Sequence, residues 1–501
     1  MKKIFVLFLI FVNFVFFIPS YLKAQNLPIT PNLQLKYRIK LGDVSFYARA
    51  GHFTDAFMRF SPNGKFLAIG TFLGRIIVLN AKTGHILWKH RIFEGMIKKI
   101  GFSPDSKTIY YGEQSPDGFI YAADTKTGHI KWQFSMAKYL KRGIPATKGD
   151  IYGIYREPGC YRLKVLKNGN ILVLGIHSWP DHKKGYWRRL SMIWLLSSKG
   201  QVIWKWPKNK PIELSLYYAD ADPNGNYVAT VAILPSDKLP PNYPYTPGTI
   251  YVLDGKTGKE VAHYKMEPLR PYYHSVSIWE SVAVDPLDKF VVVGTSDGRG
   301  FIFDLKTLHP IKILHLATPI IIGGIPVAAT ATYVHITSNR TIFFQTSSSS
   351  IPYGLPVQAN QPAGPHPNAQ TIFAVSPKGK ILWRFHAPFK FQGFASDGHS
   401  KILATVAGAA SKMVSERKTN QFGIFVFNLK KKGGGIQKFL GYFPTIAPLF
   451  FHLAVSPDAH LIAACETPYI NEEEKLVGTY QVDVISIKEN SKNISPNSTN
   501  L

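Results

Sequence analysis

One pattern of residues repeats along the chain, and this repeat restricts the fold more than any other feature. A Ser-Pro turn at Ser61, an apolar run and a Lys-Thr-Gly turn lead to Trp88, and a second copy begins 42 residues later at Ser103 and ends at Trp132. Three copies are strong and five are weaker, which makes eight copies. The strong copies are residues 58–91, 99–134 and 217–266, and the weaker ones are 161–206, 281–316, 326–385, 393–442 and 450–487.

Each copy divides into four short apolar runs separated by Ser-Pro, Asn-Gly and Thr-Gly turns. Runs of about four to eight residues bounded by such turns indicate strands rather than helices. Asp124, Asp254 and Asp304 stand at the Lys-Thr corners and are expected to bond the backbone N–H groups there. A period of about 40–50 residues with four strands each is typical of a β-propeller blade. The sequence therefore predicts an all-β fold, an eight-bladed β-propeller of four-stranded antiparallel blades.

The two ends of the repeat region complement each other. The last copy stops after its third strand, at Val482–Ile487, and the segment Leu33–Leu41 before the first copy resembles a fourth strand. We expect this N-terminal strand to complete the last blade, because a closed ring leaves no unpaired central edge. The propeller then spans residues 33–488, and the polar segment 489–501 is expected to be a disordered tail.

The first 24 residues have the pattern of a secretory signal. Lys2 and Lys3 precede an apolar run, 4–18, and Ala24 lies at the expected cleavage position. The run is shorter than the roughly 20 residues that span a bilayer, and an uncleaved membrane anchor is the alternative. We expect the signal, 1–24, to be removed, the mature protein to be exported to the periplasm or the extracellular space, and no transmembrane helix to remain.

The segment Ile77 to Trp88, Ile-Val-Leu-Asn-Ala-Lys-Thr-Gly-His-Ile-Leu-Trp, resembles the repeat of quinoprotein-like β-propellers of the pyrroloquinoline quinone (PQQ) type. The Ser-Pro-Asn-Gly-Lys-Phe-Leu-Ala turn that begins at Ser61 is similar to WD40-type repeats. The resemblance covers nearly all of residues 33–488. It implies that a tryptophan on the outer edge of a blade packs against the next blade, at Trp88, Trp132, Trp204 and Trp383.

The same resemblance raises the possibility of an enzyme, since quinoprotein alcohol dehydrogenases hold PQQ beside a calcium or lanthanide ion bound by acidic and Asn side chains. Many also have a disulfide between adjacent cysteines, whereas Cys160 and Cys465 are far apart here and are expected to be unpaired thiols. The glutamate run 472–474 suits a solvated loop better than a metal cage. The sequence therefore predicts no cofactor, no metal and a non-catalytic role, with a PQQ-dependent oxidoreductase or a degenerate cofactor-binding relative as the alternative.

The long connections fall on one face of the predicted ring. Adjacent strands are antiparallel, so the turns after the first and third strands of each blade share a face, and these turns are short. The connections after the second strand and between blades lie on the other face, which we term the loop-rich face. It holds the segments 177–189, 234–248, 347–370, 408–423 and 466–478 and the links 136–161 and 267–280. Loops on a rigid scaffold tend to carry function, so this face is the predicted binding surface; insertions tolerated anywhere on a surface are the alternative.

One segment of this face, 177–189, combines cations, aromatic rings and histidines. The candidate binding residues are His177, Trp179, His182, Tyr186, Trp187, Arg188 and Arg189. Arginine for bidentate contact and tryptophan for stacking favour an anionic or sugar-like ligand, and a solvated loop whose rings pack on their neighbours is the alternative. A metal site from His177, Asp181 and His182 is not expected, because one short loop supplies too few ligands in fixed geometry.

The chain is strongly basic, with 59 Lys and Arg against 31 Asp and Glu and a formal net charge of +28. Such an excess often indicates nucleic acid, but an exported protein meets little of it. A protein or an anionic envelope polymer is the expected partner of a monomer, and a basic surface without a partner is the alternative. In shape the expected ring is similar to the eight-bladed propeller lipoprotein of the bacterial outer-membrane assembly machinery, although no cysteine lies near residue 24.

Overall fold

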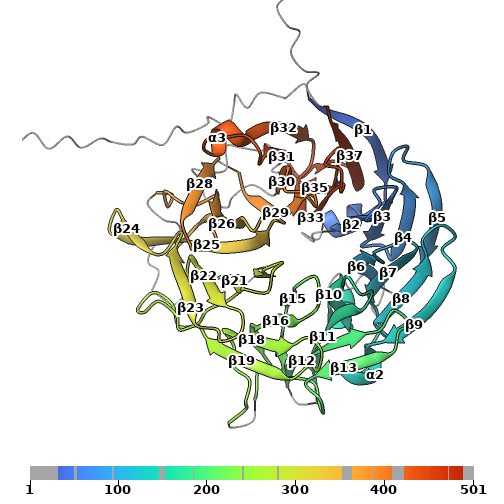
Figure 1. Ribbon diagram of the computed structural model, residues 1–501, viewed down its shortest axis with the longest axis horizontal. Helices are drawn as coiled ribbons and strands as arrows, with labels where there is room; N and C mark the ends of the chain where they lie inside the picture. The colour runs from blue at the N-terminus through green and yellow to red at the C-terminus, as the bar shows by residue number, and fades with distance from the viewer. Residues whose placement is uncertain are drawn as a thin grey trace, which may run out of the picture.

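The structure is a computed structural model that describes residues 32–49, 54–92, 95–145, 153–183, 185–239, 242–278, 281–352, 364–387, 389–408, 422–471 and 473–488. Its regular structure is almost entirely antiparallel strand, and the sheets stand in a ring around a central axis (Figure 1). The chain is therefore an all-β propeller, as the sequence predicts. The signal, the C-terminal tail and parts of the 347–370 and 408–423 segments lie outside the described residues.

Five sheets have four strands each and share one order, with the first-named strand nearest the axis. The first contains β2 (Ala56–Phe60), β3 (Phe66–Thr71), β4 (Arg75–Asn80) and β5 (Ile86–Arg91); the second β15 (Tyr218–Ala221), β16 (Tyr227–Ala232), β18 (Thr249–Asp254) and β19 (Glu260–Lys265); the third β20 (Val282–Val284), β21 (Phe290–Gly294), β22 (Arg299–Asp304) and β23 (Pro310–His315); the fourth β29 (Phe391–Ser396), β30 (Ile402–Ala407), β31 (Phe422–Asn428) and β32 (Phe439–Thr445); and the fifth β33 (Leu449–Val455), β34 (Leu461–Glu466), β37 (Gln481–Ile487) and β1 (Leu33–Lys40).

Two larger sheets contain the same four-stranded unit. One joins β6 (Met96–Phe102), β7 (Thr108–Gln114), β8 (Phe119–Asp124) and β9 (Ile130–Ser135) to β10 (Gly159–Val165), β11 (Ile171–Asp181), β12 (Tyr186–Leu196) and β13 (Val202–Trp206). Its two halves meet at one residue pair, Gly159 with Gln114. The other consists of β25 (Ile325–Ile336), β26 (Ile342–Ser350), β27 (Thr371–Val375) and β28 (Ile381–His386), extended by β24 (Ile320–Ile322).

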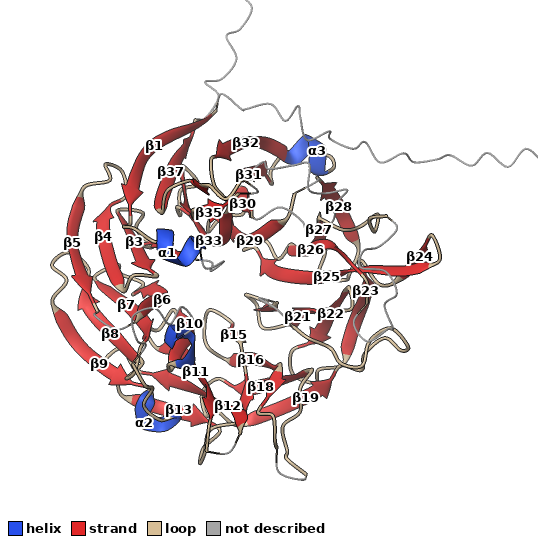
Figure 2. Ribbon diagram, turned by 180° about the vertical axis from the view of Figure 1, so that it is seen from behind, coloured by secondary structure: helices blue, strands red, loops and turns tan. Residues whose placement is uncertain are grey.

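Short elements occupy the connections. Helices α1 (Ser45–Arg49) and α2 (Ala137–Leu140) and the 3-10 helix Gly153–Arg156 lie in links between sheets, and α3 (Gly435–Lys438) lies between β31 and β32. The two-stranded pairs β14 (Leu214–Ser215) with β17 (Leu234–Pro235) and β35 (Tyr469–Ile470) with β36 (Leu476–Val477) lie in connections of the loop-rich face; α1 and β35 are labelled in Figure 2. Within the described residues, none of the helices has both the length and the apolar character needed to cross a membrane.

The N-terminal strand closes the ring, as the sequence predicts. β1 pairs antiparallel with β37, from Leu33 opposite Ile487 to Lys40 opposite Gln481, and the two strands lie side by side in Figure 1. The Arg38 side chain donates to the buried carboxylate of Asp483 at 2.9 Å, which joins the two strands a second time. Since this sheet draws on both ends of the described chain, opening the ring requires breaking the β1–β37 ladder.

Apolar side chains from neighbouring sheets fill the space between them. Leu67, Ile69 and Leu79 of the first sheet, for example, form one cluster with Val482 and Val484 of the last. The innermost strands also contact one another in order around the axis: β2, β6, β10, β15, β20, β25, β29, β33 and again β2. These strands therefore form the wall of the central channel, and their axis-facing side chains line it.

Three edge tryptophans link a four-stranded unit to the next one along the chain. The indole N–H of Trp88 donates to the backbone oxygen of Thr125 at 2.8 Å, that of Trp132 to Ser198 at 2.9 Å, and that of Trp204 to Gly255 at 2.8 Å. Each ring lies on a glycine with positive φ in the next turn, at Gly128, Gly200 and Gly258. Trp383 packs on Phe427, and its indole N–H bonds to no residue in the described part of the chain.

The aspartates at the Lys-Thr corners cap their turns, as predicted. In Asp304 the Oδ1 atom accepts from the backbone N–H groups of Lys306 and Thr307, at 3.1 and 2.9 Å, and from the Thr307 hydroxyl at 2.9 Å. Asp124 and Asp254 make the same three bonds in their own turns. These carboxylates therefore accept hydrogen bonds within their own turns, which lie on the face with the short turns.

Residues 177–189 differ from the sequence prediction. They are not a loop but the end of a long hairpin, because β11 and β12 pair residue by residue from Ile171 opposite Leu196 to Asp181 opposite Tyr186. The tryptophans and Tyr186 favour extended backbone, so the ladder continues far beyond the other strands of its sheet. Both cysteines are free, as the sequence predicts, and both are buried; Cys160 lies within β10.

Candidate ligand-binding cavity

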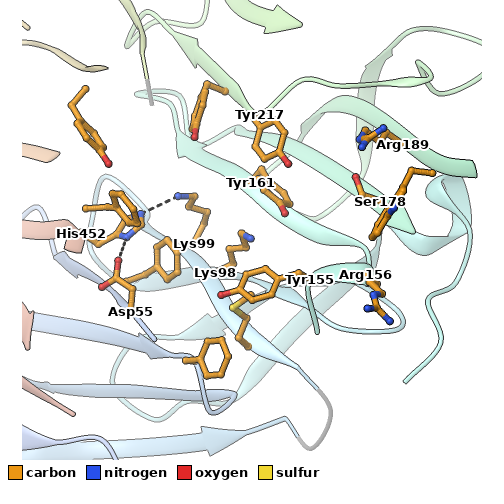
Figure 3. A pocket seen from close by; sticks show the side chains of 17 residues that line it. Asp55, Lys98, Lys99, Tyr155, Arg156, Tyr161, Ser178, Arg189, Tyr217 and His452 are labelled. Carbon is orange, nitrogen blue, oxygen red and sulfur yellow. Dashed lines mark hydrogen bonds and ion pairs between the residues drawn. The ribbon is translucent and has the colours of Figure 1, made fainter. Parts of the chain in front are cut away.

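A cavity of about 710 Å³ lies at the loop-rich end of the central channel. Innermost strands provide much of its wall, and links and hairpin ends provide the rest (Figure 3). The lining residues are Asp55, Phe57, Phe72, Met96, Lys98, Lys99, Tyr155, Arg156, Tyr161, Ser178, Trp187, Arg189, Tyr217, Tyr218, Tyr333, Phe451 and His452. Its size falls within the range of small-molecule sites, roughly 300–1,000 Å³.

Aromatic rings form most of the wall. Tyr161 of β10 meets Tyr217 edge to face, with ring centroids 5.4 Å apart. On another part of the wall, Tyr333 of β25 lies 5.7 Å from Phe451 of β33. Burial raises the pKa of Tyr161 to about 12, so its phenol stays neutral at physiological pH. Such rings offer flat apolar faces together with hydroxyl groups that can hydrogen-bond.

Two consecutive lysines reach the cavity because of a β-bulge. The ladder between β6 and β7 shifts between Ile97 and Lys99, so that Lys98 is the extra residue. In a regular strand neighbouring side chains point to opposite faces, and a bulge changes that direction. Lys98 Nζ donates to Gln114 Oε1 at 2.8 Å and lies 3.8 Å from the centroid of the Tyr161 ring. Figure 3 shows Lys98 and Lys99 between His452 on one side and Tyr161 on the other.

Lys99, His452 and Asp55 form a hydrogen-bonded row. The Nζ atom of Lys99 lies 3.3 Å from Nε2 of His452, and Nδ1 of the same ring contacts the Asp55 carboxylate. A neutral imidazole satisfies both contacts, since it donates from Nδ1 to Asp55 and accepts at Nε2 from the ammonium. Burial and the nearby cations hold the pKa of His452 well below its usual value. The imidazole is therefore neutral at physiological pH.

Further cations line the channel below the cavity. Lys164 Nζ lies 2.9 Å from Oδ1 of Asp220, and Arg162 contacts the same carboxylate. Although burial alone would raise it, these two cations hold the pKa of Asp220 at about 2. Arg59 of β2 lies close enough to Arg162 and Asp220 for both of their charges to affect its pKa. Three neighbouring inner strands, β2, β6 and β10, thus carry a concentration of positive charge.

The hairpin residues predicted as a site are only partly brought together. Trp187 and Arg189 line the cavity, and Ser178 joins them from the same segment. Arg189 is held by Asp237, with Nη1 3.1 Å from Oδ1, and Arg188 by Glu213 at 2.7 Å. The hairpin therefore contributes one cation and one large ring to the cavity wall, on a rigid support.

The other predicted residues lie elsewhere. His177 is buried, with Nδ1 2.8 Å from the Leu140 oxygen and Nε2 3.0 Å from the Arg156 oxygen, and burial lowers its pKa to about 4. Trp179 stacks on the His177 ring at 4.3 Å. His182 is exposed in the hairpin turn and Tyr186 begins β12 next to it. His177 therefore anchors the Arg156 segment and does not face solvent.

The sequence patterns predict function in loops, whereas the lysines of the cavity lie inside a strand. A usable signal exists in the segment Met96-Ile-Lys-Lys-Ile-Gly-Phe102, where two lysines interrupt an apolar run. The channel cations Arg59, Arg162 and Lys164 likewise stand inside first strands of their copies. Lys98 and Lys99 lie in the wall of the cavity, and their place inside an innermost strand distinguishes them from the lysines of the exposed turns.

The cavity does not fit a quinone held against a metal ion. Among its described lining residues Asp55 is the one carboxylate, and it contacts His452. The described part of the chain has no group of three or more His, Cys, Asp and Glu side chains that could hold a metal. A hard cation needs several oxygen ligands, which these residues do not supply.

Comparison with known proteins supports the fold. A family model described as "Outer membrane protein assembly factor BamB" matches residues 48–151, a minor part of the chain. No protein of curated function matches the sequence.

Solved structures match over most of the chain. A europium-containing methanol dehydrogenase is 12% identical with a TM-score of 0.54, covering 91% of this chain and 93% of its own. The quinohemoprotein alcohol dehydrogenase from Comamonas testosteroni is 10% identical with a TM-score of 0.56, covering 93% and 78%. The C-terminal WD40 domain of Sif2 is 11% identical with a TM-score of 0.51, covering 91% and 100%. The chain is therefore a β-propeller, similar in fold to these dehydrogenases and to the WD40 domain.

Proposed function

We propose that the protein is an exported, non-catalytic propeller that binds a partner protein through its loop-rich face. We also infer that the ring has eight blades. Two observations support this count. The four-stranded unit occurs five times as a separate sheet, twice in the eight-stranded sheet and once in the five-stranded sheet, and the innermost strands of these units contact one another in a closed order. An experimental structure with a different number of blades would contradict it.

The observation that carries the proposal is the position of exposed apolar side chains. Phe46, Ile144 and Ile446 are 55%, 85% and 65% exposed, and all three lie in links between sheets. Trp187 and Leu476 are also exposed and belong to connections after a second strand. Both kinds of connection lie on the loop-rich face. Other exposed apolar side chains lie on outer strands, for example Ile86 and Ile311. Those in the connections give the loop-rich face an apolar component, which supports an interaction surface there.

The composition of this face favours a protein over a purely anionic polymer. A hydrated polymer removes little apolar side-chain surface from water, whereas a protein partner buries apolar side chains at the centre of the interface. Basic residues such as Lys141 and Arg156 stand on the same face, and the whole chain is strongly basic. The partner that fits best is therefore a protein with an acidic rim around an apolar patch. An anionic envelope polymer is the alternative outcome of the test.

The test compares two sets of matched substitutions in the full-length protein expressed in its own cell envelope. The first is the triple variant Phe46→Ser, Ile144→Ser and Ile446→Ser on the loop-rich face. The control is Leu287→Ser, which lies in a short turn on the opposite face and is 59% exposed. We expect co-purification of one defined protein with the wild type and the control, and its loss with the triple variant. Equal recovery from all three would refute the proposed face.

Export is tested separately. A chain without residues 1–24 is expected to stay in the cytoplasm, while the full chain appears in the periplasmic or extracellular fraction without these residues at its N-terminus. N-terminal sequencing of the exported protein gives the cleavage position. A full chain that remains cytoplasmic would contradict export, and one that is exported with residues 1–24 intact would indicate the uncleaved anchor.

A further inference from the structure

We propose that a second cavity, beside Trp383, binds a phosphate monoester that accepts hydrogen bonds from the Trp383 indole N–H and from Lys438. This space, which we term the Trp383 cavity, has a volume of about 240 Å³. It lies between the side chains of Trp383 and Leu382 on β28 and the turn 429–438, which joins β31 to β32. Turns between a third and a fourth strand lie on the face with the short turns. The site is therefore separate from the proposed partner face, and its test does not depend on a partner.

Trp383 lacks a hydrogen bond that the other three edge tryptophans make. Each of those donates to a backbone oxygen at the start of the turn between the third and fourth strands of the next unit. The corresponding oxygen here belongs to Leu429, which directly follows β31 as Thr125 follows β8. The Leu429 oxygen instead accepts from Lys438 Nζ at 3.1 Å. The indole N–H of Trp383 thus bonds to no residue that the structure describes, and its ring lines the cavity.

The turn 429–438 is held against the neighbouring sheet. Helix α3 of this turn contacts β28, and the two lie together at the outer edge of the ring in Figure 1. A Cβ on Gly435 would lie 2.4 Å from the Arg384 backbone oxygen, so this close approach requires a glycine. Lys438 donates to the backbone oxygen of Lys431 as well as to that of Leu429, which fixes the two ends of the turn to each other. The cavity therefore has a defined wall on both sides.

The turn carries four lysines. Lys430, Lys431 and Lys432 are exposed and follow one another near its start, and Lys438 ends it. In the part of the chain that the structure describes, no carboxylate pairs with any of these four ammonium groups. An ammonium group has three N–H donors, and the two backbone contacts of Lys438 use two of them. One donor of Lys438 therefore remains for a ligand, and a bound anion would supply the negative charge that the turn lacks.

The size and the donors of the Trp383 cavity favour a phosphate group. Its volume of about 240 Å³ lies below the roughly 300–1,000 Å³ of sites for drug-sized ligands, so it suits a small group. Its described wall offers the indole N–H and an ammonium group and contains no carboxylate. A phosphate monoester has three acceptor oxygens and a charge of about −1.5 to −2 at neutral pH, more than a carboxylate carries. Phe343 and Leu382 add apolar surface for the carbon part of the ester.

The experiment measures binding to the purified protein by isothermal titration calorimetry. Glycerol 1-phosphate, glycerate and glycerol have one carbon skeleton with a phosphate, a carboxylate and no charge. We expect glycerol 1-phosphate to bind about tenfold more tightly than glycerate, and glycerol not to bind. Co-sedimentation with phosphatidylcholine vesicles, with and without phosphatidic acid, tests the same monoester as a lipid headgroup. Tighter binding to the phosphatidic acid vesicles than to the soluble ester assigns the site to a headgroup, and the reverse assigns it to a soluble compound.

Two triple variants separate the site from the overall charge of the protein. The first replaces the lysines of the turn 429–438, by Lys430→Met, Lys431→Met and Lys432→Met. The control replaces three exposed lysines in the corresponding turns of other sheets, by Lys126→Met, Lys256→Met and Lys306→Met. Both remove the same charge from the same face of the ring. The first is expected to weaken binding of the phosphate about tenfold, and the control is expected to leave it unchanged.

The role of the indole is tested directly at the Trp383 N–H. Trp383→Phe is expected to weaken binding of the phosphate about tenfold, because a hydrogen bond to a charged group is lost. Trp132→Phe, whose indole is bonded to Ser198, should leave the affinity unchanged. In nuclear magnetic resonance spectra of protein with ¹⁵N-labelled tryptophan, the signal that disappears in Trp383→Phe belongs to this indole. That signal is expected to shift when glycerol 1-phosphate is added.

Several results would overturn the proposal. Equal losses in the two triple variants would mean that binding follows overall charge. Unchanged affinity in Trp383→Phe together with an unshifted indole signal would place the ligand elsewhere. Glycerate that binds as tightly as glycerol 1-phosphate would contradict the choice of phosphate. Absence of binding for both the soluble ester and the phosphatidic acid vesicles would refute the site. Thermal melting establishes that each variant is folded before its affinity is compared.

Discussion

The contact between Trp88 and the next blade is expected to contribute several kcal/mol to the free energy of unfolding. Trp88 is 9% exposed, and its N–H donates to the Thr125 oxygen at 2.8 Å. Trp88→Phe keeps an aromatic ring but leaves a buried carbonyl without this donor, which costs about 1–3 kcal/mol. Trp88→Ala also removes the ring and is expected to cost about 3–5 kcal/mol. Trp383→Phe, at a site without this bond, is expected to cost about 1 kcal/mol less than Trp88→Phe.

A substitution at Gly128 separates the energy of the contact with the Trp88 ring from the strain of the glycine backbone. Gly128 has φ +76°, and a Cβ added there would lie 2.8 Å from the Trp88 ring. Gly128→Ala therefore meets a left-handed backbone penalty of about 1–2 kcal/mol and, in addition, a clash with the indole. In the Trp88→Ala background the clash with the indole is gone, while the backbone penalty and a tight contact with the His90 ring, at 3.1 Å, remain. The two substitutions are thus expected to be non-additive, with a coupling of about 1–3 kcal/mol.

The assay is urea unfolding followed by far-ultraviolet circular dichroism, which does not depend on the tryptophan that is replaced. Unfolding free energies are compared for the wild type, both single variants and the double variant at one temperature. Strict additivity of Trp88→Ala and Gly128→Ala would refute the argued contact, because it would mean that the ring does not rest on the glycine. An unchanged free energy for Trp88→Phe would refute the role of the hydrogen bond.

Three more predictions follow from the described residues. Burial raises the pKa of Glu113 to about 7 from 4.5, so the stability associated with its protonated form is present below about pH 4.5 and is lost as pH rises through 7. Glu113→Gln should therefore raise the unfolding free energy by about 3 kcal/mol at pH 8 and by little at pH 4. The same gain at both pH values would contradict burial of the charged carboxylate as the cause. Asp304→Ala removes three hydrogen bonds of the turn and should lower the unfolding free energy measured in urea by about 1 kcal/mol. Asp304→Asn keeps an acceptor oxygen and should recover most of that loss, whereas a purely electrostatic role of the carboxylate predicts no recovery. Addition of PQQ and Ca²⁺ should give neither a protein-bound quinone spectrum nor dye reduction with alcohols, amines or sugars; a bound spectrum with turnover would favour the oxidoreductase alternative.

The features that the sequence predicted well are those that repeat locally. Apolar runs, tight turns and the capping aspartate at Asp304 recur within a few residues, so the strand pattern, the antiparallel sheets and the closing strand Leu33–Lys40 follow from the printed sequence. The free thiols also follow, since Cys160 and Cys465 stand in separate copies. The hairpin end at 177–189 was taken for a loop because its charged residues obscured the strand propensity of its tryptophans.

The cavity could not be derived in the same way, because it is assembled from residues that are distant in the chain. Asp55 and His452 are 397 positions apart and meet only when the ring closes. Lys98 and Lys99 depend on a bulge, and a shift of one residue in a ladder leaves no trace in the hydrophobic pattern of β6. What the sequence does hold is the anomaly itself, two adjacent charges inside an apolar strand. In this ring the innermost strands contact one another around the axis, so charges inside such a strand mark side chains that can line the channel, and this is the part of the cavity that the sequence contains.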